Sequence, residues 1–353
     1  METWGAPKFP PELRLRSTEP NFILLGSPIG DTHFCSSHVD QLRLSNKKLL
    51  DSLSKLEDPQ VALHLLRTCS SFCKFVYIAR TTPPSLVADS LALCDQDIAK
   101  CLEKLAAIEL TSKALCQAQL CLTMGGLGLR SLQKHCSAAF IASHIQALPD
   151  LLTQHLRSAF LLYSSAVGLL SPMGEDEISS VMTSSTTQRT LSTRIDRSDR
   201  ASLFADSLLA DQIRLTSLTA QRTASWLVAL PCRGPVDLTL TPDEMQVALK
   251  HRLGLPLSQP DDTCPLCDDE TELDVLGHHH ITCSTGGFVT VRHNRLRDCL
   301  FQFCSRAGLG PLREFGAERV TVLVQISPAQ PISSSPVGRW PSLLPLTSSL
   351  SRR

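Results

Sequence analysis

Apolar residues recur at helical spacing through the first 150 residues, and Pro or Gly interrupts each run. The stripes are Leu42, Leu49, Leu50, Leu53 and Leu56; Val61, Leu65, Cys69, Phe72 and Val76; and Leu86, Leu93, Cys94, Ile98, Cys101, Leu102 and Leu105. Side chains three or four positions apart share one face of an α-helix and bury it against a neighbour. Aromatic residues make up only 5% of the 353 residues, which disfavours a β-sandwich. The sequence therefore predicts a mainly α fold.

The breaks between stripes predict where helices begin. Helical periodicity starts at Asp40, and Asp58-Pro59 predicts a restart with Pro in the first turn. After Pro83-Pro84, Ser85 is the expected N-cap of the next helix. Residues 125–130 (GGLGLR) lack the Gly-Lys-Ser/Thr ending of a phosphate loop, so we expect a structural turn between helices over 110–122 and 131–148.

Segments outside these helices are less regular. Residues 22–30 (FILLGSPIG) predict one strand that ends at a Gly/Pro turn, and its lack of an obvious partner suggests that a piece is missing upstream. Residues 171–200 are rich in Ser, Thr and charge and are expected to be a linker. Further helices are expected over 203–230, from Pro242 with Thr241 as cap to Gly254, and over 295–307.

The 14 cysteines predict a reducing environment. The N-terminus shows no basic and apolar leader, and no apolar run approaches the ~18 residues of a membrane span, so we expect an intracellular chain without disulfides. Seven cysteines at helical spacing are expected to be small buried core residues. They are Cys69, Cys73, Cys94, Cys101, Cys116, Cys121 and Cys136.

A Cys/His cluster follows the helix that is expected from Pro242 to Gly254. Cys264 and Cys267 are separated by two residues, a spacing that can place two thiolates on one tetrahedral zinc ion. Cys283 supplies a further thiol, and one of the histidines at 278–280 is the expected remaining ligand. Spacing alone leaves the histidine open. Four protein ligands make a closed site, which is typical of structural rather than catalytic zinc.

A basic cluster comes shortly after the last cysteine of this site. Its members are Arg292, His293, Arg295 and Arg297. They could contact phosphate, or they could be the exposed start of a helix. Lys plus Arg and Asp plus Glu both number 34, which argues against a protein that coats polyanions but leaves room for a local basic face.

Several segments, taken in order, resemble one family. They are residues 22–30 (FILLGSPIG), 58–67 (DPQVALHLLR), 77–84 (YIARTTPP), 125–131 (GGLGLRS), 226–231 (WLVALP), 252–256 (RLGLP), 264–283 and 292–298 (RHNRLRD). Over roughly residues 8–315 the chain resembles the part downstream of the polymerase palm in reverse transcriptases of non-LTR (LINE-like) retrotransposons. The family pattern Gly-Asp-His-Ala-Leu-x-Cys, laid on residues 277–283, selects His279 as the ligand.

The resemblance also implies what should be absent. A reverse transcriptase needs two metal-binding carboxylates at a Tyr/Phe-x-Asp-Asp turn, and the sequence contains none. Phe204-Ala205-Asp206-Ser207 lies in a helical segment and lacks the second Asp. No catalytic residue is therefore predicted. From about residue 321 the tail is expected to be out of frame, because a one-base shift permits a reading that resembles the family's nuclease-like segment after Glu314.

The combined interpretation is a truncated protein derived from such a reverse transcriptase, with residual binding of RNA or single-stranded DNA and one structural zinc. The expected parts are a strand/turn remnant (1–38), a thumb-like helical domain (39–170), a linker (171–200), a helical segment (201–256), a zinc-knuckle-like module with its helix (257–310) and a disordered tail (311–353). Two alternatives stay open. One is a helical scaffold with a purely structural zinc, and the other is a fragment of an active reverse transcriptase or endonuclease.

Overall fold

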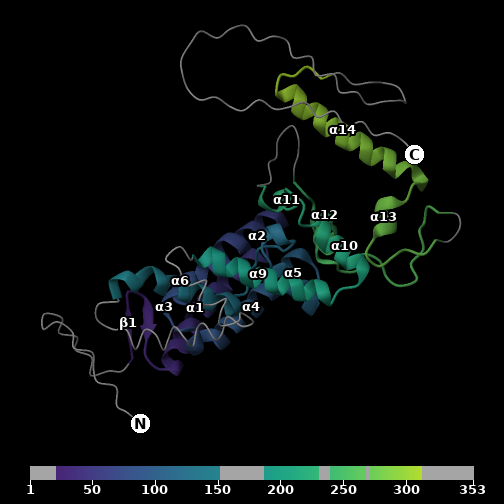
Figure 1. Ribbon diagram of the computed structural model, residues 1–353. Coiled ribbons are helices and arrows are strands. Elements are labelled where there is room, and N and C mark those ends of the chain that lie inside the picture. Colours follow the sequence, from purple (N-terminus) through teal and green to yellow (C-terminus); the bar gives the residue numbers. More distant parts are fainter. Residues whose placement is uncertain (1–20, 152–186, 230–238, 268–270, 312–353) are drawn as a thin grey trace, which may run out of the picture. The chain divides into compact units, whose positions relative to one another are not determined.

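The computed structural model describes residues 21–151, 187–229, 239–267 and 271–311. The chain divides into two units, Met1–Gly286 and Gly287–Arg353. The described part is mainly helical, which confirms the predicted fold class (Figure 1). The expectations for residues 1–20, for the first part of the linker and for the tail from residue 312 lie outside the described residues.

A β-hairpin replaces the single strand expected near the N-terminus. Strands β1 (Phe22–Leu24) and β2 (Ser27–Ile29) pair antiparallel, with Phe22 opposite Ile29. Leu25 and Gly26 make the turn with φ of 49° and 83°, the left-handed conformations that tight hairpin turns require. The prediction of one unpaired strand was therefore wrong, because the chain reverses at Gly26 and supplies its own partner.

The first helices begin at residues that cap them. Helix α1 (Thr32–Leu53) starts eight residues earlier than predicted, because the Asp31 carboxylate accepts a hydrogen bond from the Phe34 N–H. Helix α2 (Pro59–Leu65) has Pro59 in its first turn, as the sequence predicted, and Asp58 caps it through hydrogen bonds from the N–H groups of Gln60 and Val61. Helix η1 (Leu66–Ser70) and α3 (Phe72–Thr81) follow. Helix α4 (Pro84–Ala106) starts at Pro84 without a side-chain cap, so the assignment of Ser85 was wrong.

The core of the first unit forms where these helices meet α6 (Leu132–Leu151). Helix α4 packs on α1 and α6, and α3 packs on α6. Phe75 and Leu91 are fully buried there. The cysteine prediction holds only in part. Cys94, Cys101 and Cys136 are buried, Cys116 and Cys121 are half-buried, and Cys69 and Cys73 are exposed.

Helix α9 (Gln188–Ala205) runs along α6 and corrects the linker prediction for residues 188–200. Thr187 caps it by accepting a hydrogen bond from the Thr190 N–H. The single helix expected over 203–230 is also wrong: α9 ends at Ala205, and α10 (Leu209–Ser217) and α11 (Ser225–Val228) follow. Leu208 is extended and Arg222 has φ of 67°, and both positions interrupt helical geometry.

Two buried arginines tie the glycine-rich turn to the later helices. That turn follows α5 (Ser112–Gln119) and η2 (Leu122–Met124), and it precedes α6. Arg252 near the end of α12 (Pro242–Leu253) donates hydrogen bonds to the Gly126 carbonyl, and Arg214 donates to Gln117 Oε1 at 3.0 Å. A Cβ on Gly126 would lie 2.0 Å from the Leu120 carbonyl oxygen. The GGLGLR segment is therefore a structural turn, as predicted.

The predicted bounds of α12 agree with the structure, whereas the start predicted for the helix over 295–307 does not. Helix α12 starts behind Thr241, which forms a capping box with Glu244, and stops at Gly254 (φ 66°), both as predicted. Helix α14 (Phe288–Arg306) starts seven residues before the predicted position and has no buried residue. None of the described helices has the length and apolar character needed to cross a bilayer.

Candidate metal centre

The two N-terminal cysteines of the cluster lie in a loop that is closed by backbone hydrogen bonds. Thr263 and Glu272 form an antiparallel bridge. The Cys264 N–H donates to the Thr271 carbonyl at 2.9 Å, and the Leu273 N–H donates to the Asp262 carbonyl at 2.8 Å. These bonds hold the ends of the loop together, so that Cys264 and Cys267 face the same space. Cys264 is buried and Cys267 is half-buried.

The other two ligand candidates lie at the two ends of a short helix, α13 (His278–Thr282). The Asp274 carboxylate accepts hydrogen bonds from the N–H groups of His278 (2.8 Å) and His279 (2.6 Å) and so fixes the start of the helix. Burial alone would raise the pKa of Asp274, but these two N–H groups outweigh it and hold the pKa below its usual value. Gly277 precedes the helix with φ of 79°, and a Cβ there would lie 2.6 Å from Leu257 Cδ1.

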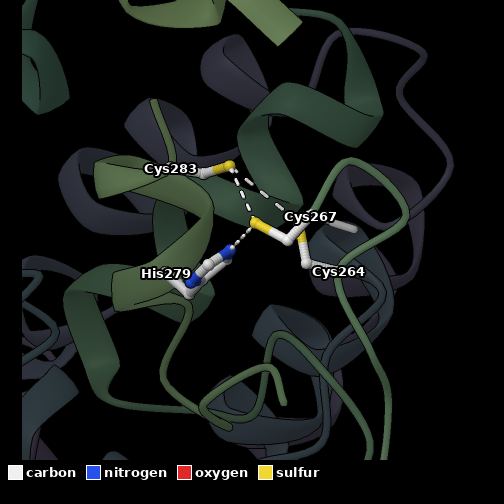
Figure 2. A group of neighbouring side chains, drawn as sticks. All are labelled: Cys264, Cys267, His279 and Cys283. Atoms are coloured by element: carbon white, nitrogen blue, oxygen red, sulfur yellow. Dashed lines mark hydrogen bonds between the residues drawn. The ribbon is translucent and has the colours of Figure 1, made fainter. Parts of the chain in front are cut away.

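The four side chains converge on one point (Figure 2). The ligand atoms of Cys264, Cys267, His279 and Cys283 all lie within 4.8 Å of one another. Sγ of Cys283 is 3.9 Å from Sγ of Cys264 and 3.8 Å from Sγ of Cys267, and Nε2 of His279 is 3.5 Å from Sγ of Cys267.

These separations fit a tetrahedral metal ion and exclude disulfides. Zinc–ligand bonds of about 2.3 Å to sulfur and 2.0–2.1 Å to nitrogen place tetrahedral neighbours about 3.8 Å (S to S) and about 3.6 Å (N to S) apart. A disulfide would need its sulfurs at about 2.05 Å. All three cysteines are free thiols. The donor set therefore fits one four-coordinate ion.

The structure separates the three adjacent histidines. His279 points its ring into the cluster (Figure 2). His278 and His280 are exposed and are not part of the cluster. The choice of His279, which the family pattern implied, agrees with this arrangement. His279 lies in the first turn of α13, and Cys283 is the residue that ends the helix. The two are four positions apart, so their side chains lie on the same face.

The thiols differ in their electrostatics. The Leu266 N–H donates a hydrogen bond to Cys264, which is the main reason that the pKa of Cys264 falls to about 6. The Thr285 hydroxyl lowers the pKa of Cys267, but burial and the two neighbouring thiols outweigh it and raise that pKa above the ordinary value. A bound dication would deprotonate its coordinating thiols. The cluster thus offers one thiol, Cys264, that is readily ionised and one, Cys267, whose ionisation a bound cation would favour.

The predicted basic cluster lies in the second unit, on α14, and the structure describes it separately from the metal site. Arg292, His293 and Arg295 are exposed, while Arg297 is half-buried and donates a hydrogen bond to Asp298 at 3.0 Å. At about 100° per residue, Arg295 and Arg297 lie about 160° apart around the helix axis. These residues therefore do not form one continuous basic face.

A second group of basic residues was missed because it lies in the segment predicted as a linker. Arg189, Arg194, Arg197 and Arg200 are all on α9. Arg194, Arg197 and Arg200 follow one another at three-residue spacing, which places them on one side of a helix, and the sequence did contain this signal.

No protein-family model, curated protein or solved structure matches the chain. The resemblance to the post-palm part of non-LTR reverse transcriptases therefore stays a prediction that depends on the quoted segments.

Proposed function

We propose that the chain is a zinc-stabilised nucleic-acid-binding protein. The observation that carries the zinc assignment is the set of distances among three thiols and one imidazole, which matches the edges of a tetrahedron around zinc. Soft thiolates together with an imidazole favour zinc over magnesium or calcium, which prefer oxygen ligands. All four positions are filled by protein, so the ion is structural.

Zinc in this site would hold the loop at Cys264 and Cys267 to helix α13. The backbone already preorganises both parts, through the Thr263–Glu272 bridge and through Asp274. The metal would supply the cross-link between them. We propose no catalytic step at this centre.

The nucleic-acid part of the proposal depends on basic side chains that reach solvent. Helix α14 begins five residues after Cys283 and presents Arg292 and Arg295. Arginine matches phosphate oxygens with two parallel N–H donors, and such contacts bind RNA or single-stranded DNA without reading its sequence. The segments that resemble non-LTR reverse transcriptases, and that follow one another in the same order as in that family, favour the same partner. A retroelement origin and an intracellular location are also parts of the proposal.

A metal analysis of single-residue variants tests the zinc site. Zinc content per chain should be about one for the wild type and should fall strongly in His279→Ala. His278→Ala is the matched control, because it removes the neighbouring exposed imidazole. Equal loss in the two variants, or greater loss in His278→Ala, would contradict the ligand assignment.

A salt titration tests the binding function against the scaffold alternative. The equal numbers of basic and acidic residues, 34 each, favour a scaffold whose zinc serves stability alone. Phosphate contacts release counterions, so binding of a labelled RNA or DNA strand must weaken steeply as salt rises. Absence of binding to either strand at 50 mM salt would support the scaffold. A frame that encodes Tyr/Phe-x-Asp-Asp in the genomic sequence just upstream would support the retroelement origin.

A further inference from the structure

Helix α9 has one face that packs on the bundle and one that is lined by arginine. Leu191, Ser192, Asp196 and Leu203 are buried. At about 100° per residue, the four arginines fall within an arc of about 140° on the other side of the helix. Arg189 and Arg197 are exposed, and Arg194 and Arg200 are half-buried. At 1.5 Å per residue the row from Arg189 to Arg200 is about 16 Å long.

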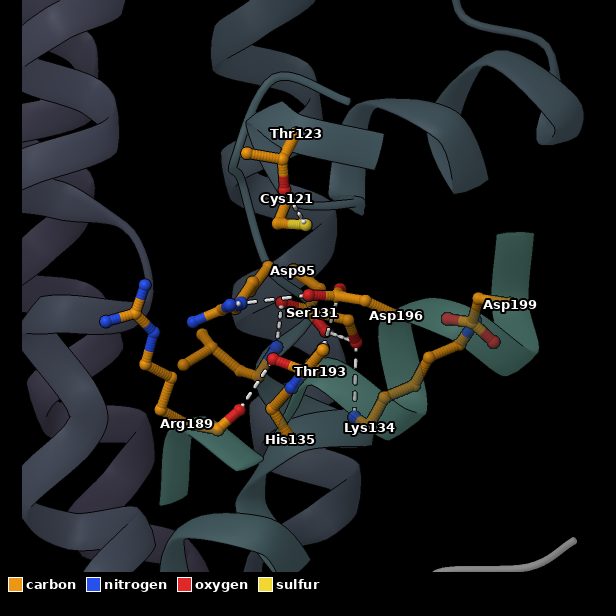
Figure 3. Close-up of polar contacts among 12 residues, drawn as sticks. Asp95, Cys121, Thr123, Ser131, Lys134, His135, Arg189, Thr193, Asp196 and Asp199 are labelled. Atoms are coloured by element: carbon orange, nitrogen blue, oxygen red, sulfur yellow. Dashed lines mark hydrogen bonds and ion pairs between the residues drawn. The ribbon is translucent and has the colours of Figure 1, made fainter. Parts of the chain in front are cut away.

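The two carboxylates of α9 are turned toward α6 and do not neutralise this row (Figure 3). Asp196 has a side chain only 2% exposed and pairs with Arg130 at 3.3 Å. Asp199 pairs with Lys134 at 2.8 Å. Asp196 thus pairs with Arg130 in the glycine-rich turn and Asp199 pairs with Lys134 in α6, so neither carboxylate pairs with an arginine of α9.

The four arginines have no carboxylate partner among the described residues, since the ion pairs found there involve other side chains. Arg200 lies over the Phe204 ring at 5.9 Å. Nε of Arg200 and Nη1 of Arg194 are buried without a hydrogen-bond partner in the described structure, so the two exposed arginines, Arg189 and Arg197, offer most of the solvent-facing charge. Figure 3 shows Arg189 with its guanidinium directed away from the cluster of Asp95, Ser131 and Asp196. A row of unpaired guanidinium groups is a surface that favours anions.

We propose that this outer face of α9, the arginine face, binds the phosphodiester backbone of a nucleic acid. The inference rests on the proposed nucleic-acid-binding function, and it adds a contact surface in the first unit to the one proposed on α14. A strand presents one phosphate per about 3.4 Å of duplex axis, so a row about 16 Å long spans enough phosphates for each arginine to contact one.

The side chains between the arginines favour nucleic acid over a lipid surface. They include Thr190, Thr193, Ser198 and Ala201. An amphipathic helix that lies on an anionic membrane inserts large apolar residues beside its basic ones. The arginine face offers small and polar residues in those places, which suit contacts to phosphate and sugar.

The test measures binding of full-length protein to a fluorescent 20-nucleotide RNA and to the DNA strand of the same sequence, as a function of salt. The variant R189Q/R197Q removes the two exposed arginines. Loss of two phosphate contacts should lower the slope of log affinity against log salt by about 1.4 and weaken binding roughly 10- to 30-fold at 0.1 M salt. The variant R189K/R197K keeps the charges and should recover most of the salt slope.

Two matched variants locate the effect. K47Q/K48Q removes two exposed positive charges from α1, and R292Q/R295Q removes two from α14. If K47Q/K48Q weakens binding as much as R189Q/R197Q, or if R189Q/R197Q binds like the wild type, the arginine face is not the site. If only R292Q/R295Q weakens binding, this inference fails and the proposed function stands.

If the wild type binds neither strand, both the inference and the proposed function fail. Binding only to phosphatidylserine vesicles would identify a lipid surface and overturn the proposal. Thermal unfolding followed by circular dichroism verifies that each variant folds.

Discussion

The helical bundle of the first unit and the segment 257–286, here called the metal loop, are stabilised by different means. The bundle buries large apolar side chains such as Phe75 and Phe140 almost completely. In the metal loop the described residues that are buried are Ser258, Cys264 and Gly277, none of which is large and apolar. A segment without an apolar core must be ordered by backbone pairing and by cross-links. The comparison suggests that the bundle folds without metal and that the metal loop does not.

Removal of the metal tests this comparison most strongly. In Cys264→Ser, or after treatment with a zinc chelator, hydrogen exchange should become fast in the metal loop and stay slow in α4 and α6. The expected effect is large because zinc contributes about 10–16 kcal/mol to small zinc-stabilised folds.

The matched control is Cys69→Ser, which changes an exposed thiol outside the cluster and should leave exchange unchanged. Equal exchange in the metal loop with and without zinc would show that backbone pairing alone orders it. Faster exchange across the whole bundle would show that the two regions are not independent.

The converse experiment removes core volume from the bundle. Phe75→Ala should lower the free energy of unfolding by about 3–5 kcal/mol, because it deletes a fully buried ring and leaves a cavity. Chemical denaturation followed by helical circular dichroism measures the loss.

Zinc content of the folded Phe75→Ala protein should stay at the wild-type value. Tyr77→Ala, two positions away with a side chain that is 46% exposed, should cost less. A loss of zinc equal to that of His279→Ala would contradict the separation of bundle and metal loop.

Where the sequence was sufficient, the local chemistry decided the structure. Pro59 marks the first turn of α2, Thr241 caps α12 through its own side chain, and Cys264 and Cys267 are close in sequence. Helix α9 was missed because its buried face contains Ser192 and Asp196, and Asp196 contacts Arg130 in the glycine-rich turn and His135 in α6. Apolar periodicity does not show a face that is buried through polar contacts with residues far away in the sequence.

Two other features needed three-dimensional geometry. The hairpin requires Leu25 in a left-handed conformation, which is rare for residues other than Gly and is not signalled by the sequence. Spacing alone left the choice among three adjacent histidines open, and only the family resemblance selected His279. In the structure that choice depends on where α13 begins, and Asp274 fixes that start from outside the helix.

Buried arginines connect the bundle to α12, directly before the metal loop. Arg252→Met should lower the free energy of unfolding by about 2–3 kcal/mol, because it removes the side-chain donors of the buried Gly126 carbonyl and leaves the Leu122 carbonyl with the Gly125 N–H alone. The change should also loosen α12 in hydrogen exchange. Lys48→Met, on an exposed position of α1, controls for loss of a positive charge. A change within 0.5 kcal/mol would show that burial of the guanidinium costs as much as its hydrogen bonds contribute.

The smallest expected effect is a pH dependence of the bundle alone. His135 is 2% exposed, and burial lowers its pKa to about 3, with Arg130 and Lys134 adding to the shift. Its side chain also faces Asp196 at 3.7 Å and the Phe72 ring. Because the pKa of His135 in the folded protein lies below the ordinary value of 6.5, the unfolded chain binds a proton between pH 6.5 and 3 and the folded chain does not. His135 therefore contributes stability above pH 6.5 that is lost as pH falls toward 3.

Between pH 6.5 and 5 the loss should be about 1–2 kcal/mol in the wild type and absent in His135→Asn. Burial raises the pKa of Asp196, so its contribution changes with the opposite sign and remains in both proteins. Measuring both in a Cys264→Ser background removes protonation of the metal ligands from the comparison. If the free energy of unfolding changes with pH by the same amount in both proteins, His135 is protonated in the folded bundle and Asp196 is the charge that compensates it.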